Sequence, residues 1–287
     1  YLNTQQQNTY FSQLCPVAQR VRAHLAPQRE DFAQAHYLGC GHGLLAFALL
    51  FHERLPEAND WIAELNGAFH KVLGMVPDDG FYPHGINLWI YEHTFLVRFL
   101  ELLGRASGQD LWAETSYWRN TSEFRRMTLS PDGQLGITFG DPQYRVSGDA
   151  WIHFLIAIRT QSAAAQSLGL ILQDQPTHGV DVRSVPPRRK IWEYLYYMPD
   201  IPVQQLTSRV QLYADGGQVV WRETEGPDTW LLTTRAGNPL GRRRYEAGEW
   251  SGYGHSDPAN GAFLMVHNKT FWLCGPGPVY RRDTGLH

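Results

Sequence analysis

Apolar residues recur at helical spacing through the first part of the chain, with polar loops of Pro, Asp and Gly between the segments. In one segment the apolar side chains fall on a single helical face, and Asn59 or Asp60 is placed to cap its start. The face comprises Trp61, Ile62, Leu65, Phe69, Val72 and Leu73. The helices expected from this spacing cover residues 32–55, 59–76, 90–108 and 150–172. Such an order predicts helical hairpins packed side by side.

The pattern changes from helical to alternating near residue 174. Residues 176–190 carry prolines and charges and are typical of a linker. Alternating residues then flank Asp215-Gly216-Gly217, which predicts a β-hairpin, and we expect antiparallel sheet over residues 205–287. Helices followed by strands favour an α+β fold with two segregated domains.

Composition limits the class of protein. The 287 residues are 43% hydrophobic and 18% charged, which is typical of a folded globular chain. A net charge of -3 argues against a general nucleic-acid binder, and no apolar run is long enough to predict a membrane span. Three cysteines without CxxC spacing favour neither a disulfide framework nor a zinc ribbon. The aromatic content of 13% fits a sugar-binding cleft or a large core.

The stretch PDDGFYPHGINLWIYEHTF, residues 77–95, places His84 seven residues before Tyr91. One interpretation is a proton-transfer pair at the start of a helix, and the other is packing, with Tyr91 in the aromatic core. We expect the neighbouring Glu92 and His93 to face solvent.

A second group of histidines lies in AHYLGCGHG, residues 35–43. His36 and His42 are six residues apart, which does not place both rings on one helical face as an HExxH-type metal site requires. Small residues in this helix leave room for a groove or a close helix contact. A satisfied histidine in or near the core is the alternative.

Tyr253, His255 and Asp257 alternate in WSGYGHSDPANGAFLMV, so an extended backbone would point all three to one face. Histidine and carboxylate suit Zn²⁺, with Cys274 or His287 as further ligands, whereas Asp257-Pro258 also suits a plain turn.

Arginines cluster at four places in this mildly acidic chain, and guanidinium groups suit capture of carboxylate or sulfate. The alternative for each cluster is solvated surface charge. The clusters are Arg125-Arg126, Arg188-Arg189-Lys190, Arg242-Arg243-Arg244 and Arg281-Arg282.

Three segments together resemble the heparinase II/III-like polysaccharide lyases. DGFYPHGINLWIY resembles the family's DGSF-x-QHG…Y segment, and YADGGQVVWRETEGPDTWLLTTRAG resembles its first sandwich strands, with an Arg, a GPD and an RAG. GYGHSDPANGAFLMVHNKTFWLCGPG resembles its HGHAD-x-NSF…DPG segment. The resemblance runs from about residue 30 to the end and implies an incomplete (α/α) toroid over residues 1–180, followed by an antiparallel β-sandwich over residues 181–287. We expect the natural polypeptide to continue beyond His287.

The resemblance implies β-elimination at a uronic acid, with no organic cofactor. His84 matches the histidine of the QHG segment and is the candidate base or carboxylate neutraliser, and Tyr91 matches the tyrosine that protonates the leaving oxygen. His36 or Tyr37 falls nearest to an Asn that binds the carboxylate in the family. The remaining candidates for substrate binding are Asn87, Trp89 and Arg242.

Two departures from the family pattern affect these roles. Tyr253 replaces the first histidine of HGHAD and remains a candidate acid or base, while His255 matches the second, often a ligand of a structural metal. Cys274 replaces the Asp that completes that site, with His287 as the possible next ligand, so a Zn²⁺ site is either kept with altered ligands or lost.

The sequence therefore favours a secreted or periplasmic lyase that cleaves an anionic, uronate-containing polysaccharide or oligosaccharide. A non-catalytic glycan-binding protein and a uronyl epimerase remain as alternatives. A glycoside hydrolase ranks last, because it needs two carboxylates that face each other, and only Asp78, Asp79 and Glu92 lie near the candidate pair.

Overall fold

The structure is a computed structural model that describes residues 3–27, 35–137, 139–140, 149–173, 188–225, 228–249, 260–268 and 270–273. At positions 35, 87, 188 and 189 the backbone alone is described. The chain divides into two compact units, one comprising Tyr1–Met75 with Glu92–Leu111 and the other Val76–Tyr91 with Trp112–His287. The domain boundary expected at residue 180 stays a prediction.

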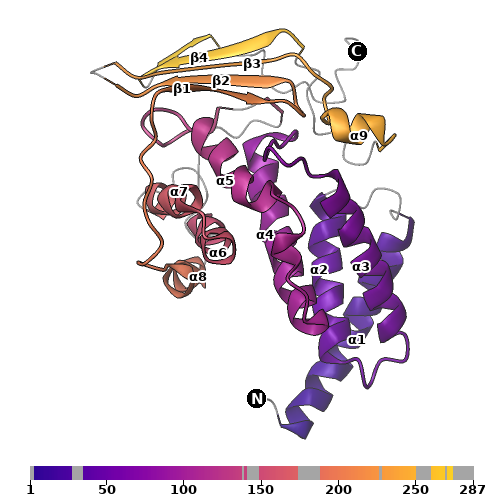
Figure 1. Ribbon diagram of the computed structural model, residues 1–287. Coiled ribbons are helices and arrows are strands. Elements are labelled where there is room, and N and C mark those ends of the chain that lie inside the picture. The colour runs from indigo at the N-terminus through magenta and orange to yellow at the C-terminus, as the bar shows by residue number, and fades with distance from the viewer. Residues whose placement is uncertain are drawn as a thin grey trace. The chain divides into compact units, whose positions relative to one another are not determined.

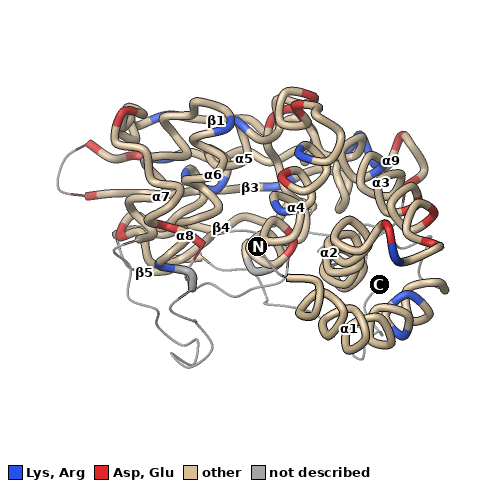
Figure 2. The backbone as a smooth tube through the Cα atoms, turned by 90° about the horizontal axis from the view of Figure 1, so that it is seen from below, with Lys and Arg blue, Asp and Glu red and all other residues tan. Residues whose placement is uncertain are grey.

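The first unit is helical. Its helices are α1 (Thr4–Leu25), α2 (Ala35–Leu50), α3 (Ala58–Met75) and the later turns of α4 (Gly85–Ser107). α2 carries no Asp, Glu, Lys or Arg (Figure 2). The predicted apolar face of α3 is confirmed, because Trp61, Leu65 and Phe69 are buried. The predicted caps are wrong, since α3 begins at Ala58 and both candidates lie inside its first turn.

α4 begins five residues before its predicted start at residue 90 and ends, as predicted, before Gly108, whose φ is 72°. The prediction that Glu92 and His93 face solvent is wrong. Both side chains are buried, at 2% and 0% exposure, within a helix whose following turns pack as core.

The described residues of the second unit form four further helices besides the start of α4 and a short helix, α9 (Arg242–Glu246). They are α5 (Tyr117–Met127), α6 (Ala150–Thr160), α7 (Ala163–Gln173) and α8 (Arg188–Tyr196). The single helix predicted over 150–172 is two helices, because Gln161 adopts a left-handed conformation with φ 53° that ends α6. The end of the predicted linker, residues 188–190, is the first turn of α8.

The predicted antiparallel sheet is confirmed over the described strands, which follow one another in the order β1-β2-β3-β4-β5 (Figure 1). They are β1 (Arg209–Tyr213), β2 (Gln218–Glu223), β3 (Trp230–Arg235), β4 (Ala262–His267) and β5 (Thr270–Leu273). The hairpin predicted at Asp215-Gly216-Gly217 joins β1 to β2. One face of the sheet forms a core in which Leu231, Leu264 and Val266 pack with Ile137 and Phe139. The fold is therefore helix-rich with an antiparallel sheet, which places it in the predicted α+β class.

A chain of polar contacts joins the loop before α4 to the sheet. The Asp79 carboxylate accepts hydrogen bonds from the backbone N–H of Phe81 at 3.0 Å and of Asp215 at 3.0 Å. Arg243, in α9, donates to the Asp78 carboxylate at 2.8 Å and to the carbonyl of Val76 at 2.5 Å. The hairpin tip thus holds the loop from which α4 begins. No described helix is long and apolar enough to cross a membrane.

Gly80 is where this loop tolerates no side chain. Its φ is +82°, and a Cβ atom there would lie 2.4 Å from the backbone carbon of Asn120. We predict that Gly80→Ala lowers the free energy of unfolding by about 2–4 kcal/mol, because backbone strain adds to a collision that cannot be relieved by a side-chain movement. Urea unfolding followed by circular dichroism measures this.

Gly248 provides the matched control, since its φ is +70° but a Cβ atom there would meet nothing within 4 Å. Gly248→Ala therefore carries the strain alone, about 1 kcal/mol. Equal losses in the two variants would contradict the close approach at Gly80.

Candidate functional site

The candidate site starts where the loop 77–84 enters α4. Gly85 has a φ of 81°, and a Cβ atom at Gly140 would lie 2.7 Å from the carbonyl carbon of His84, so the backbone is closely packed at this point. The His84 side chain has 0% exposure. Its Nδ1 lies 3.3 Å from the Tyr82 hydroxyl, and the two rings meet edge to face. His84 is thus held inside the protein with a phenol as a hydrogen-bond neighbour.

Tyr91 lies two turns into α4 and is exposed. His84 precedes α4, and the positive φ of Gly85 separates it from the helical turns, so the seven-residue spacing does not by itself place His84 and Tyr91 on one side of the helix. The exposed fraction of Tyr91 is 42%, whereas Ile86 and Leu88 between them are buried. The alternative that Tyr91 is a core aromatic residue is therefore wrong.

Trp89 lies between these two positions and is 1% exposed. Its indole N–H donates to the Thr121 hydroxyl at 2.8 Å, and its ring stacks on His153 at 4.9 Å with an interplanar angle of 10°. The Arg125 guanidinium lies 4.8 Å from the centre of the ring. Trp89 therefore fastens the first two turns of α4 to α5 and α6, and its ring offers no exposed face to a sugar.

Beneath Trp89 is a buried network of charged and polar groups. Arg125 and Asp149 form an ion pair in which each side chain is 1% exposed, and the Arg125 guanidinium also lies 2.8 Å from Nε2 of His153. Because arginine only donates, Nε2 accepts, so the His153 proton is on Nδ1 and points to the Ser122 hydroxyl at 2.8 Å. Burial lowers the pKa of Arg125 to about 9, which still leaves it charged at neutral pH.

Sequence reasoning missed this network. Arg125 and Arg126 are each 1% exposed, so the alternative of solvated surface charge is wrong for this cluster. The available signal was His153, a single histidine in the apolar run AWIHFLIAI, where a polar side chain needs a buried partner.

The carboxylates near His84 and Tyr91 form hydrogen bonds and ion pairs that hold the fold together. Hydrogen bonds from Ser116 and Arg243 lower the pKa of Asp78, and burial raises the pKa of Asp215. Asp79 accepts two backbone hydrogen bonds, as described above. Glu92 is buried. The described residues around His84 and Tyr91 thus supply no pair of carboxylates free to face each other across a cleft, as a glycoside hydrolase would need.

The other predicted site residues are distributed along the chain. His36 is exposed and Tyr37 is buried at 2% exposure, both at the start of α2 in the first unit, so the predicted catalytic set is divided between the units. Arg242 is exposed at the start of α9. Asn87 is in the first turn of α4, and its side chain is not described. Tyr253, His255, Cys274 and His287 lie outside the described residues.

His42 fits the alternative of a histidine near the core. Its ring lies 6.0 Å from the rings of both Phe95 and Phe99. Burial, with a contribution from the charge of Arg98, lowers the pKa of His42 to about 4, so it is neutral at pH 7.

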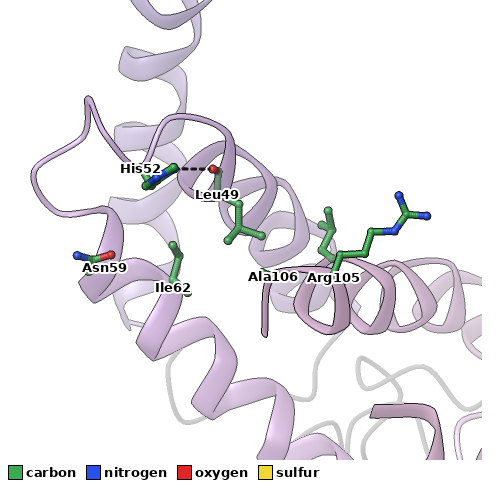
Figure 3. Close-up of a pocket in the computed structure, with 7 residues that line it drawn as sticks. Leu49, His52, Asn59, Ile62, Arg105 and Ala106 are labelled. Atoms are coloured by element: carbon green, nitrogen blue, oxygen red, sulfur yellow. Dashed lines mark hydrogen bonds between the residues drawn. The ribbon is translucent and has the colours of Figure 1, made fainter. Parts of the chain in front are cut away.

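The first unit has a hollow of about 470 Å³ lined by residues of α2, α3 and α4 and of the turn after α2 (Figure 3). In it His52 Nδ1 lies 3.2 Å from the carbonyl oxygen of Leu49, and Arg105 extends away from the other side chains (Figure 3). No predicted site residue lines it. Within the described ranges no three His, Cys, Asp or Glu side chains gather to hold a metal ion, and the predicted zinc ligands lie outside those ranges.

The contribution of the buried Arg125–Asp149 ion pair to the stability of the fold around α4 can be tested directly. We predict that Asp149→Asn lowers the free energy of unfolding by about 3–5 kcal/mol, because it leaves the Arg125 charge buried without its counter-charge. Asp200→Asn, at an exposed position in the same unit, should change it by less than about 0.5 kcal/mol. Chemical unfolding of both variants gives the two values, and similar small changes would show that the ion pair does not stabilise the fold.

By sequence, the chain matches no protein-family model and no curated protein. By structure, it is similar to the crystal structure of heparinase III, with a TM-score of 0.60 and 13% sequence identity. The similarity covers 89% of this chain and 37% of that one, so the chain spans little more than a third of that protein's length. At this identity the comparison shows the fold alone. The chain therefore has a fold similar to that of heparinase III.

Proposed function

We propose that this chain carries the catalytic region of a polysaccharide lyase that cleaves a uronate-containing, anionic glycan by β-elimination. The observation that carries the proposal is the exposure of Tyr91. Tyr91 is exposed near the start of α4, whereas Trp89, two residues earlier, is buried and donates to Thr121. The fold shared with heparinase III supports the same reading of the site.

The reaction requires three roles. A group that neutralises the uronate carboxylate acidifies the proton on C5, and a base removes that proton. The electron pair forms the C4–C5 double bond as the bond from C4 to the leaving oxygen breaks. A general acid then protonates that oxygen. In the proposal Tyr91 is this acid, and a phenol can serve because its proton is delivered as negative charge develops on the oxygen.

His84 is the proposed base or carboxylate neutraliser. Its ring is fully buried and lies against the Tyr82 hydroxyl, so the proposal requires a local rearrangement that brings His84 to the substrate. His36, Tyr37, Asn87 and Tyr253 remain proposed members of the site. Trp89 contributes by fixing the orientation of the helix that presents Tyr91, and Arg242 is exposed and positively charged, as an anionic glycan requires.

The incomplete toroid and the β-sandwich belong to this proposal as well. The sheet face opposite the Leu231 core exposes large apolar side chains, which suits a sheet that packs against a second layer. They are Val210, Leu212, Phe263 and Trp272, each at least half exposed. A secreted or periplasmic location and a structural zinc ion held by His255, Cys274 and His287 also remain proposals.

We predict that Tyr91→Phe lowers the turnover number about 10²–10⁴-fold on whichever uronate polymer the wild-type protein degrades, because it removes the acid and leaves the ring. The measurement is the ultraviolet absorbance of the unsaturated product during incubation with heparan sulfate, chondroitin, hyaluronan, alginate or glucuronan. Tyr194→Phe, which removes a hydroxyl from an 83% exposed residue of α8, should retain full activity.

Equal activity of the two variants would contradict the role of Tyr91. An absence of unsaturated product on every polymer, with binding retained, would favour a non-catalytic glycan-binding protein on this scaffold. Altered uronate stereochemistry at constant chain length would favour the epimerase.

A further inference from the structure

We propose that the second unit contains a binding site for a small ligand with one oxyanion group, a carboxylate or a sulfate. The site is a cavity of about 360 Å³ between the end of α5, the loop after it, α7 and the connection from β2 to β3. This volume is at the lower end of the range for small-molecule sites and suits a ligand the size of a monosaccharide. The polar residues that line it are Arg126, Ser130, Asp132, Arg222, Thr224 and Thr229.

Arg222 brings a buried positive charge to the cavity wall. Its side chain, from β2, is 4% exposed and donates to the carbonyl oxygens of Met127 at 3.3 Å, Ser130 at 3.4 Å and Leu129. None of these partners is a carboxylate, and Nε of Arg222 meets no acceptor in the described part of the chain. Burial, together with the charge of Arg126, lowers the pKa of Arg222 to about 10, so the group is charged at neutral pH.

Arg126 adds a second buried guanidinium. Its Nε donates to the Glu123 carboxylate at 2.7 Å and its Nη1 to the carbonyl oxygen of Gln204 at 2.7 Å, while Nη2 meets no acceptor among the described residues. Glu123 is shared, because Arg209 forms an ion pair with its other oxygen. The Glu123 carboxylate is therefore divided between Arg126 and Arg209, so it neutralises the charge of Arg126 only in part.

Asp132 is the carboxylate among the described residues that line the cavity. Its Oδ1 accepts hydrogen bonds from the Ser130 hydroxyl at 2.6 Å and from the backbone N–H of Gln134 at 3.2 Å. Of the charged side chains that line the cavity, Arg126 and Arg222 are positive and Asp132 is negative. One positive charge is left over, and a buried charge without a counter-charge is unfavourable.

A monovalent anion in the cavity would supply that counter-charge. Arg126 and Arg222 are almost fully buried. Their positive charges therefore attract the anion strongly, because the protein interior screens charge weakly. Thr224 and Thr229 are partly exposed and can hydrogen-bond the ligand directly. None of the residues proposed for catalysis lines the cavity, so this site does not rest on the proposed function.

Isothermal titration calorimetry at constant ionic strength, with chloride as the balancing anion, tests the site. We expect saturable binding of glucuronate or of glucose 6-sulfate and none of glucose. Arg222→Met should weaken that binding about tenfold to a hundredfold, because a charged partner is lost. Arg119→Met removes the same charge from an exposed position of α5 and should leave the affinity unchanged.

Inorganic sulfate shows whether the sugar contributes to binding. If sulfate binds with the same affinity as the two acidic sugars, a free anion is enough to occupy the site. Binding that survives in Arg222→Met, or that is absent for every anion, would overturn the proposal. Should Arg222→Met not fold, amide NMR on the wild-type protein decides. Saturable shifts at Gly133 and Thr229 with glucuronate or glucose 6-sulfate would support the site, and shifts confined to other residues would overturn it.

Discussion

The buried ion pair between Arg125 and Asp149 is the interaction on which the candidate site depends. Both groups are almost completely removed from water, so each is tolerable only in the presence of the other. His153 accepts from Arg125 and stacks on Trp89, and Trp89 is two residues from Tyr91 on α4. The position of the exposed phenol is thus set by contacts made on the buried side of the same helix, where polar partners specify one orientation.

Polar contacts also join the helices of the second unit to its sheet. Asp79 accepts from the hairpin tip, Arg243 donates to the loop before α4, and Arg222 donates to the carbonyls that follow α5. Each of these hydrogen bonds joins a charged side chain to a backbone group. Each therefore holds one segment of backbone at a defined place next to another element. The PDDGF segment and the Asp-Gly-Gly turn, which looked like candidate chemistry and a plain hairpin, meet here as structural partners.

Periodicity predicted most of the architecture because it reports which face of an element is buried. It gave the apolar face of α3 and the antiparallel strands, and it missed α1, whose only buried residues are Ala18 and Leu25. It also joined α6 to α7, since a left-handed residue such as Gln161 leaves no mark in a hydrophobic pattern.

The site was less predictable than the fold. Glu92, His93 and Arg125 are polar residues that a pattern assigns to solvent, yet they are buried. The partners of Arg125, which are Asp149 and His153, lie more than twenty residues along the sequence, and only the folded chain shows them. Conversely, the exposure of Tyr91 in an aromatic run could not be inferred from the run itself, because sequence favours the core for such a residue.

We propose that the site breaks a glycosidic bond by elimination, on a fold similar to that of heparinase III. Mass spectrometry of the fragments released from a uronate polymer tests it most directly. Elimination predicts that each new non-reducing end carries an unsaturated uronate and that the fragment masses add up to the parent mass. Fragments that together exceed the parent by one water for each cleavage would show hydrolysis and would contradict the account.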